Sequence, residues 1–127
     1  MNEAKENIII AKSYSFALKV IELYKYLVSE KKEFVLSKQF LRCGTSIGAN
    51  VHEAVASESK KDFIHQLGIA LKEARETFYW LSLLSDSSYI SKDQATDLNN
   101  SCEEIIRILN SIILTTKERY FQNIHNS

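Results

Sequence analysis

Apolar residues recur at intervals of three, four and seven along most of the chain, the spacing that places them on one face of an α-helix. This periodicity predicts four helices, over about residues 7–30, 37–56, 59–84 and 91–120. Short polar stretches separate them. In the last helix the apolar positions alternate steps of four and three, which is typical of a heptad pattern that packs against other helices.

Capping signals support three of the predicted helix starts. Ser91 is followed three residues later by Gln94, and Ser59 by Asp62, so both pairs resemble a capping box. Asn7 is a candidate N-cap for the first helix. These signals place helix boundaries at short polar turns.

Four helices with short connections predict an all-α fold, an up-down-up-down antiparallel four-helix bundle. The 127 residues include no proline and only three glycines, which favours long uninterrupted helices. No repeat or composition change divides the chain, so residues 1–127 are expected to form a single domain. Gly44 and Gly48 lie inside the second helix, where we expect close packing against a neighbour.

The first helix carries more apolar surface than one core needs. Its apolar side chains cover an arc of about 220°, against the width of about 100° that one core requires. The candidate oligomer contacts are Tyr14, Leu18 and Ile21 on this helix, and Ile69 and Trp80, which lie off the core seam of the third helix. A homo-oligomer explains this second stripe, and the alternative is a central helix in a crowded bundle.

A polar stripe flanks the core face of the second helix and faces a similar flank of the third. Its members are Gln39, Arg42, Ser46, Asn50, Glu53, Glu73 and Glu76. Counting back equally from the turn near residues 57 and 58 places Arg42 opposite Glu73 and Gln39 opposite Glu76. An internal network, a subunit contact and a ligand site are all compatible with this stripe.

The sequence lacks the residue patterns of known catalytic and metal sites. Neither the two cysteines nor the histidines show metal-ligand spacing, and no phosphate-binding loop is present. Ser46 with His65 is the remaining nucleophile–base pair, and no oxyanion site accompanies it. We therefore expect no enzyme activity, no metal and no cofactor. The chain shows neither a signal peptide nor a membrane-spanning segment, so we expect a cytoplasmic protein with reduced thiols.

The formal net charge is zero, which removes the simplest argument for general nucleic-acid binding. The charge is nevertheless unevenly distributed: residues 1–61 carry ten basic and seven acidic groups, and residues 62–127 carry six and nine. Lys5, Lys12 and Lys19 are spaced by seven and align on the first helix. Lys12 and Lys19 are the candidate phosphate contacts, and an ordinary solvated face is the alternative.

Several motifs resemble one protein family. They are Ser13-Tyr14-x-Phe16-Ala17, Ser37-Lys38-Gln39-x-Leu41-Arg42-x-Gly44-Thr45-Ser46-Ile47-Gly48-Ala49-Asn50-Val51-x-Glu53-Ala54, Ser59-Lys60-Lys61-Asp62-Phe63 and Ala70-Leu71-Lys72-Glu73-Ala74-Arg75-Glu76-Thr77-x-Tyr79-Trp80-Leu81. This pattern resembles the 23S rRNA-intervening-sequence proteins over nearly the whole chain. That family in turn resembles the accessory protein of diversity-generating retroelements, a strongly basic pentamer that binds nucleic acid.

The resemblance implies a small bacterial protein whose four-helix bundles assemble as a ring, typically a homopentamer. With the residue patterns above, it leads us to expect a non-enzymatic binding or scaffold protein. The expected partner is structured RNA, a ribonucleoprotein or an RNA-binding protein. The alternative function is a protein–protein assembly scaffold without nucleic-acid contact.

Overall fold

The computed structural model describes residues 3–126, with side chains described up to residue 123. Over this range the chain forms four α-helices and no strand: α1 (Glu3–Ser29), α2 (Leu36–Val55), α3 (Lys60–Asp86) and α4 (Lys92–Asn126). The prediction of an all-α fold with four helices is therefore confirmed.

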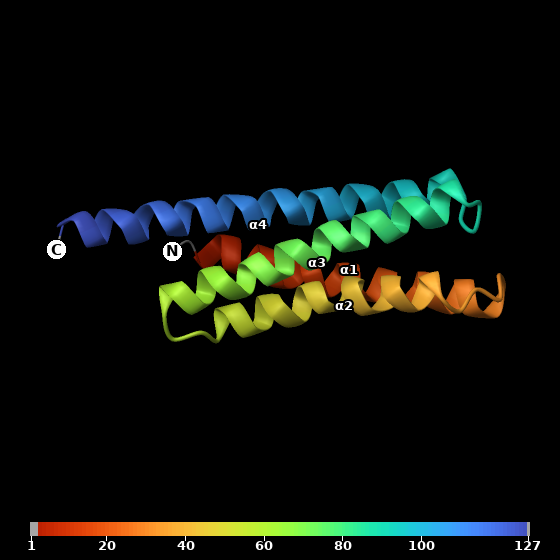
Figure 1. Cartoon of the computed structure of the whole chain (residues 1–127), viewed down its shortest axis with the longest axis horizontal. Helices are drawn as coiled ribbons and strands as arrows, with labels where there is room; N and C mark the ends of the chain where they lie inside the picture. The colour runs from red at the N-terminus through yellow and green to blue at the C-terminus, as the bar shows by residue number, and fades with distance from the viewer. Residues whose placement is uncertain (1–2, 127) are drawn as a thin grey trace.

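Each helix packs against the next one in the chain, and α1 also packs against α4. The α1–α2 and α3–α4 connections lie at one end of the molecule, and the α2–α3 connection lies at the other (Figure 1). The backbones of diagonal pairs do not approach within 8 Å between Cα atoms in the described chain, so diagonal helices meet only through side chains in the core. Every helix therefore has two helical neighbours and an outward face.

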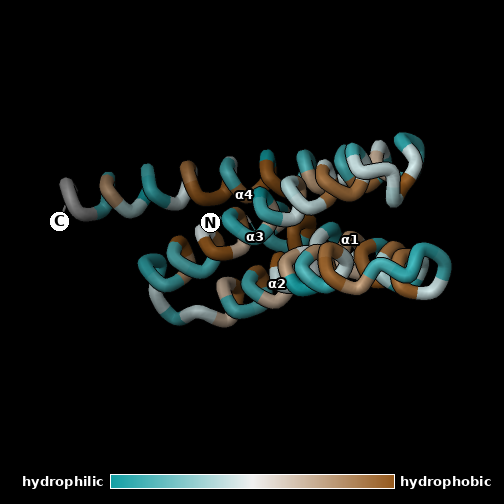
Figure 2. The backbone as a smooth tube through the Cα atoms, turned by 45° about the vertical axis from the view of Figure 1, so that its right-hand side comes forward, coloured by the Kyte–Doolittle hydropathy of each residue, from teal (hydrophilic) through white to brown (hydrophobic). Residues whose placement is uncertain are grey.

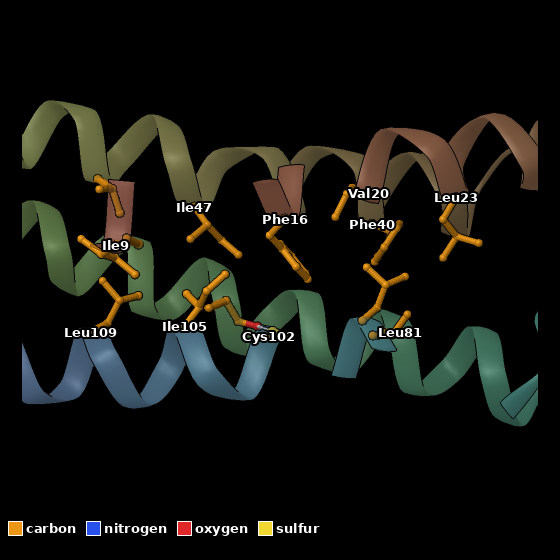
Figure 3. Packing of buried hydrophobic residues seen from close by; sticks show 14 of the residues in the cluster. Ile9, Phe16, Val20, Leu23, Phe40, Ile47, Leu81, Cys102, Ile105 and Leu109 are labelled. Carbon is orange, nitrogen blue, oxygen red and sulfur yellow. Dashed lines mark hydrogen bonds between the residues drawn. The ribbon is translucent and has the colours of Figure 1, made fainter. Parts of the chain in front are cut away.

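One apolar core fills the space between the helices. Hydrophobic and hydrophilic segments alternate along each helix (Figure 2), as expected when one face is buried. Phe16 and Val20 of α1, Phe40 and Ile47 of α2, and Ile105 of α4 are all almost fully buried. Their side chains point into the same interior space in Figure 3.

The capping signals explain where α3 and α4 begin. The backbone N–H of Gln94 donates to Ser91 Oγ at 3.1 Å, and the N–H of Ser91 donates to Gln94 Oε1 at 2.8 Å, so this capping box is complete. At α3 the N–H of Asp62 donates to Ser59 Oγ at 3.1 Å. Both predicted starts are confirmed to within one residue.

The outer boundaries of α1 and α4 differ from the prediction. α1 already begins at Glu3, so Asn7 lies inside the helix and the N-cap prediction was wrong. Glu3 and Glu6 in the first turn interact favourably with the positive end of the helix dipole. α4 continues to Asn126 because no glycine or proline follows residue 120 to stop it. At 35 residues α4 is about 52 Å long, and its C-terminal turns project beyond the other helices (Figure 1).

A buried carboxylate caps α2. Glu33 Oε2 accepts from the N–H groups of Val35 and Leu36 at 3.1 and 3.0 Å, and Oε1 accepts from the N–H of Ser37 at 2.7 Å. Burial raises the pKa of Glu33, but these hydrogen bonds outweigh burial and hold the pKa below its usual value. The sequence suggested only a polar break at this point, and the local cap was missed.

Gly44 brings α1 and α2 into close contact. A Cβ atom at this position would lie 2.8 Å from both Cγ atoms of Val20, which is closer than carbon atoms can approach. At Gly48 the nearest atoms belong to Ser13 at 3.5 Å, an ordinary contact distance. Close packing therefore requires the glycine at position 44 and merely accommodates the one at 48.

Candidate nucleic-acid interface and oligomer contacts

Three lysines of α1 reach across to α4 at regular intervals. Lys5 Nζ donates to Ser111 Oγ at 2.9 Å, Lys12 Nζ lies 2.9 Å from Glu104 Oε1, and Lys19 Nζ lies 3.0 Å from Asp97 Oδ2. The three lysines are spaced by seven residues, and so are their three partners on α4. Because α4 runs antiparallel to α1, the partners follow in the reverse order. The interface between α1 and α4 is thus crossed by one polar contact every second turn.

Hollows lie between these polar contacts. The first has a volume of about 420 Å³ and lies among Lys5, Lys12 and Arg107. A second, of about 250 Å³, follows between Lys12 and Lys19. A third, of about 300 Å³, lies beyond Lys19 toward the connection between α3 and α4. α1 and α4 are therefore held apart along a shallow groove.

The two candidate phosphate contacts lie in this groove, and each already has a partner. Glu104 neutralises the charge of Lys12, and Asp97 neutralises that of Lys19. All four side chains remain substantially exposed, so water and salt screen both pairs. A phosphate that binds either lysine must compete with the carboxylate.

The polar stripe of α2 meets α3 at a single cluster. Arg42 Nη1 lies 3.4 Å from Glu73 Oε2, and Arg42 Nη2 contacts Glu76 Oε2. The Arg42 side chain is 52% exposed, whereas Glu73 is 15% exposed. One guanidinium therefore bridges two carboxylates within a single chain and leaves a net charge of −1.

The remaining stripe residues bond within their own helix. Ser46 Oγ donates to the carbonyl of Arg42 at 2.6 Å, and Asn50 Nδ2 donates to the carbonyl of Ser46 at 2.8 Å. Gln39 and Glu53 are exposed. Gln39, which the counting places opposite Glu76, makes no side-chain hydrogen bond to it within the described chain, and Arg42 contacts Glu76 instead.

The candidate oligomer contacts lie on two outward faces. Tyr14 and Leu18 on α1 are 62% and 50% exposed, and Ile21 is half-buried. On α3, Ile69 and Trp80 are half-buried, and Trp80 stacks edge-on against Tyr79 with ring centroids 5.1 Å apart. Trp80 Nε1 is buried and has no hydrogen-bond partner within the described residues. A single chain thus leaves apolar surface uncovered on α1.

The two thiols are buried and free. Burial raises the pKa of Cys43, and burial, reinforced by Cys43 and Glu103, raises the pKa of Cys102 to about 12. Cys102 Sγ donates to the carbonyl of Ala74 at 3.3 Å. Both cysteines are protonated at neutral pH, and neither has the thiolate character that a nucleophile needs.

Ser46 and His65 do not form a nucleophile–base pair in this structure. The hydroxyl proton of Ser46 points along its own helix toward the carbonyl of Arg42, and His65 is exposed on α3. No group of three or more potential metal ligands occurs among the described residues. None of the described helices is long and apolar enough to cross a membrane.

Sequence reasoning missed the α4 side of the groove. Asp97, Glu104 and Ser111 are spaced by seven, as the three lysines are, and this matching period was a detectable signal. Arg107 was also missed, because it interrupts an apolar stretch and carries no motif of its own. It lines the first hollow.

The sequence profile of 23S rRNA-intervening sequence proteins matches residues 5–111, which include all three lysines and the whole Arg42 cluster. The chain belongs to this family. A crystal structure from Bacteroides thetaiotaomicron, of a protein of unknown function from the S23 ribosomal protein family, is 54% identical in sequence. It superposes with a TM-score of 0.85, and the match covers 86% of this chain and 97% of that one. No curated protein matches.

Proposed function

We propose that this family member is a non-enzymatic, homo-oligomeric binding protein for structured RNA or for an RNA–protein complex in the cytoplasm. Up-down-up-down bundles would assemble into a ring, most simply a pentamer. The family description supports RNA as the partner, since it ties these proteins to 23S rRNA. The groove between α1 and α4 supplies the candidate basic surface, with Lys12 and Lys19 along it.

Exposed apolar surface on α1 is the observation that carries the oligomer. Tyr14 and Leu18 lie next to each other on the outward face of α1, away from the core and the groove. Apolar clusters on a helix face are typical of protein contacts. A ring that buries this face leaves the groove free and repeats it around the assembly, so several weak phosphate contacts add up.

Light scattering tests the assembly. The wild-type chain is expected to have a mass several times that of one subunit, and Leu18→Glu is expected to reduce it because a carboxylate at the contact must be desolvated. Asn110→Glu, on an exposed position of α4, is the matched control and should leave the mass unchanged. A monomeric wild-type protein would contradict the oligomer.

An RNA titration tests the function. The probes are a fluorescent stem-loop of 23S rRNA and an unstructured poly(U) strand of the same length, each titrated at low and near-physiological salt. We expect the stem-loop to bind, with log K falling linearly as log[salt] rises, because phosphate contacts release counterions. A well-formed oligomer that binds neither RNA at either salt would contradict this function.

The alternative is an assembly scaffold for other proteins, and one observation favours it. The groove lysines are already paired with Glu104 and Asp97, and the chain carries no net charge. A protein partner does not need a basic surface. An oligomer without RNA affinity would therefore support this second function.

A further inference from the structure

The three hollows of the groove differ in charge. The first is lined by three cations, Lys5, Lys12 and Arg107, against the single carboxylate of Glu104, a net charge of +2. The third is lined by one cation, Lys19, against the three carboxylates of Glu22, Asp93 and Asp97, a net charge of −2. The groove therefore attracts anions at one end and repels them at the other.

Among the residues that the structure describes, two of the cations at the first hollow have no carboxylate partner. Lys5 Nζ donates to the neutral hydroxyl of Ser111, which leaves its charge uncompensated. Arg107 is exposed and makes no ion pair with any residue described. Lys12, in contrast, is occupied by Glu104. An anion entering this hollow can thus bind Lys5 and Arg107 without displacing a carboxylate.

The walls of the first hollow are apolar. Ile8 of α1 is 44% exposed, and Ile108 of α4 is half-buried on the opposite side. A volume of about 420 Å³ falls within the range of small-molecule sites, which begins at about 300 Å³. The combination of two free cations and aliphatic walls suits an anion that carries an apolar or planar group, and a nucleotide has this chemistry.

We infer that the first hollow is a nucleotide-phosphate site: Lys5 and Arg107 bind one phosphate group of an RNA strand, and the attached sugar or base packs on Ile8 and Ile108. The inference rests on the proposed function and moves the phosphate contact away from Lys19. The third hollow, with its excess of carboxylates, does not contact the strand. A free nucleotide shares this chemistry and is distinguished by the experiment.

The test compares variants that remove equal charge. Lys5→Gln/Arg107→Gln is expected to weaken stem-loop binding by at least about tenfold, as expected for two charge-assisted hydrogen bonds. The slope of log K against log[salt] should become shallower by about 0.7, the contribution of the one phosphate contact that the two cations share. Lys38→Gln/Lys72→Gln, at exposed positions of α2 and α3, is the matched control and should change affinity less than twofold.

Calorimetry with uridine 5′-monophosphate and with inorganic phosphate separates the possible failures. If Lys5→Gln/Arg107→Gln binds RNA as tightly as the wild type does, the inference is overturned and the proposed function stands. The wild type could instead bind the nucleotide but no RNA, with nucleotide binding lost in the variant. That result would keep the hollow as a free-nucleotide site and overturn the proposed function. Binding of neither ligand overturns both. Thermal melting confirms that each variant is folded before it is compared.

Discussion

α1 meets its two neighbours in opposite ways. Against α2 the backbones approach until Gly44 leaves room only for the side chain of Val20. Against α4 the inner side packs in the same core, but the outer edge carries hollows, and lysines cross it to Glu104 and Asp97. The first interface depends on shape and excludes water. The second combines buried apolar side chains with ion pairs that remain exposed at its outer edge.

The contrast distinguishes a closely packed interface from the exposed groove to which the proposed function assigns RNA binding. At a closely packed apolar interface, adding or removing a methyl group lowers the free energy of unfolding. Such an interface therefore tolerates little change. An interface crossed by exposed ion pairs contributes little stability, and its side chains are free to exchange partners. We therefore expect mutations at the α1–α2 interface to affect folding and mutations at the α1–α4 interface to affect binding.

The largest effect is expected at Gly44. Gly44→Ala places a Cβ against both Cγ atoms of Val20, a β-branched side chain that has few rotamers with which to move away. We expect a loss of about 1–3 kcal/mol in the free energy of unfolding, measured by urea denaturation. Gly48→Ala is the matched control: its Cβ meets only ordinary contacts, and alanine favours the helix, so stability should rise by about 0.5–1 kcal/mol. Equal effects of the two substitutions would contradict the difference in packing.

A smaller effect is expected at the Glu33 cap, which begins α2 on the closely packed side. Glu33→Gln should cost about 1 kcal/mol at neutral pH, because a neutral amide accepts the three N–H groups less well. Since the folded pKa of Glu33 is lowered, its stabilisation is present above the ordinary carboxyl pKa and is lost as the pH falls through the folded value. Wild type and variant should thus differ in melting temperature at neutral pH and converge in acid. A difference that persists in acid would assign the effect to something other than the charge.

The smallest effect is expected at the ion pairs of the open side. A double-mutant cycle with Lys12→Met and Glu104→Gln should give a coupling energy of about 0.2–1 kcal/mol that decreases in high salt. The same cycle at Lys19 and Asp97 should give less, because Asp97 is 68% exposed compared with 45% for Glu104. A coupling energy well above this range and insensitive to salt would mean that water is excluded from the groove.

The number and type of the elements were predictable because helical periodicity is a local property that survives folding. The capping boxes at Ser59 and Ser91 were readable for the same reason. The start of α1 and the end of α4 were predicted several residues too far from the chain ends. Nothing in the sequence stops either helix at the predicted boundary. The Glu33 cap was missed because a carboxylate two residues before the N-cap has no fixed sequence signature.

The surface was only partly predictable. Equal counting from the α2–α3 turn places Arg42 opposite Glu73, and the structure shows this contact. The counting did not indicate that the long side chain of Arg42 also reaches Glu76, one turn further along α3. The partners of Lys12 and Lys19 lie about 80 to 90 residues away in sequence. Local patterns alone did not identify them, and the relative position of α1 and α4 was needed.

The seven-residue period shared by α1 and α4 also defines the alignment of these two helices only up to a multiple of seven. Moving α4 by one period would place Glu104 opposite Lys19, Ser111 opposite Lys12 and Glu118 opposite Lys5, so each lysine would again face a polar acceptor. The charges therefore do not distinguish the two alignments. The buried face of α4 does distinguish them, because the shift would carry Arg119 to the level of the buried Ile112 and Asn123 to that of Thr116. The short connection between Asp86 and Lys92 also limits where α4 can start.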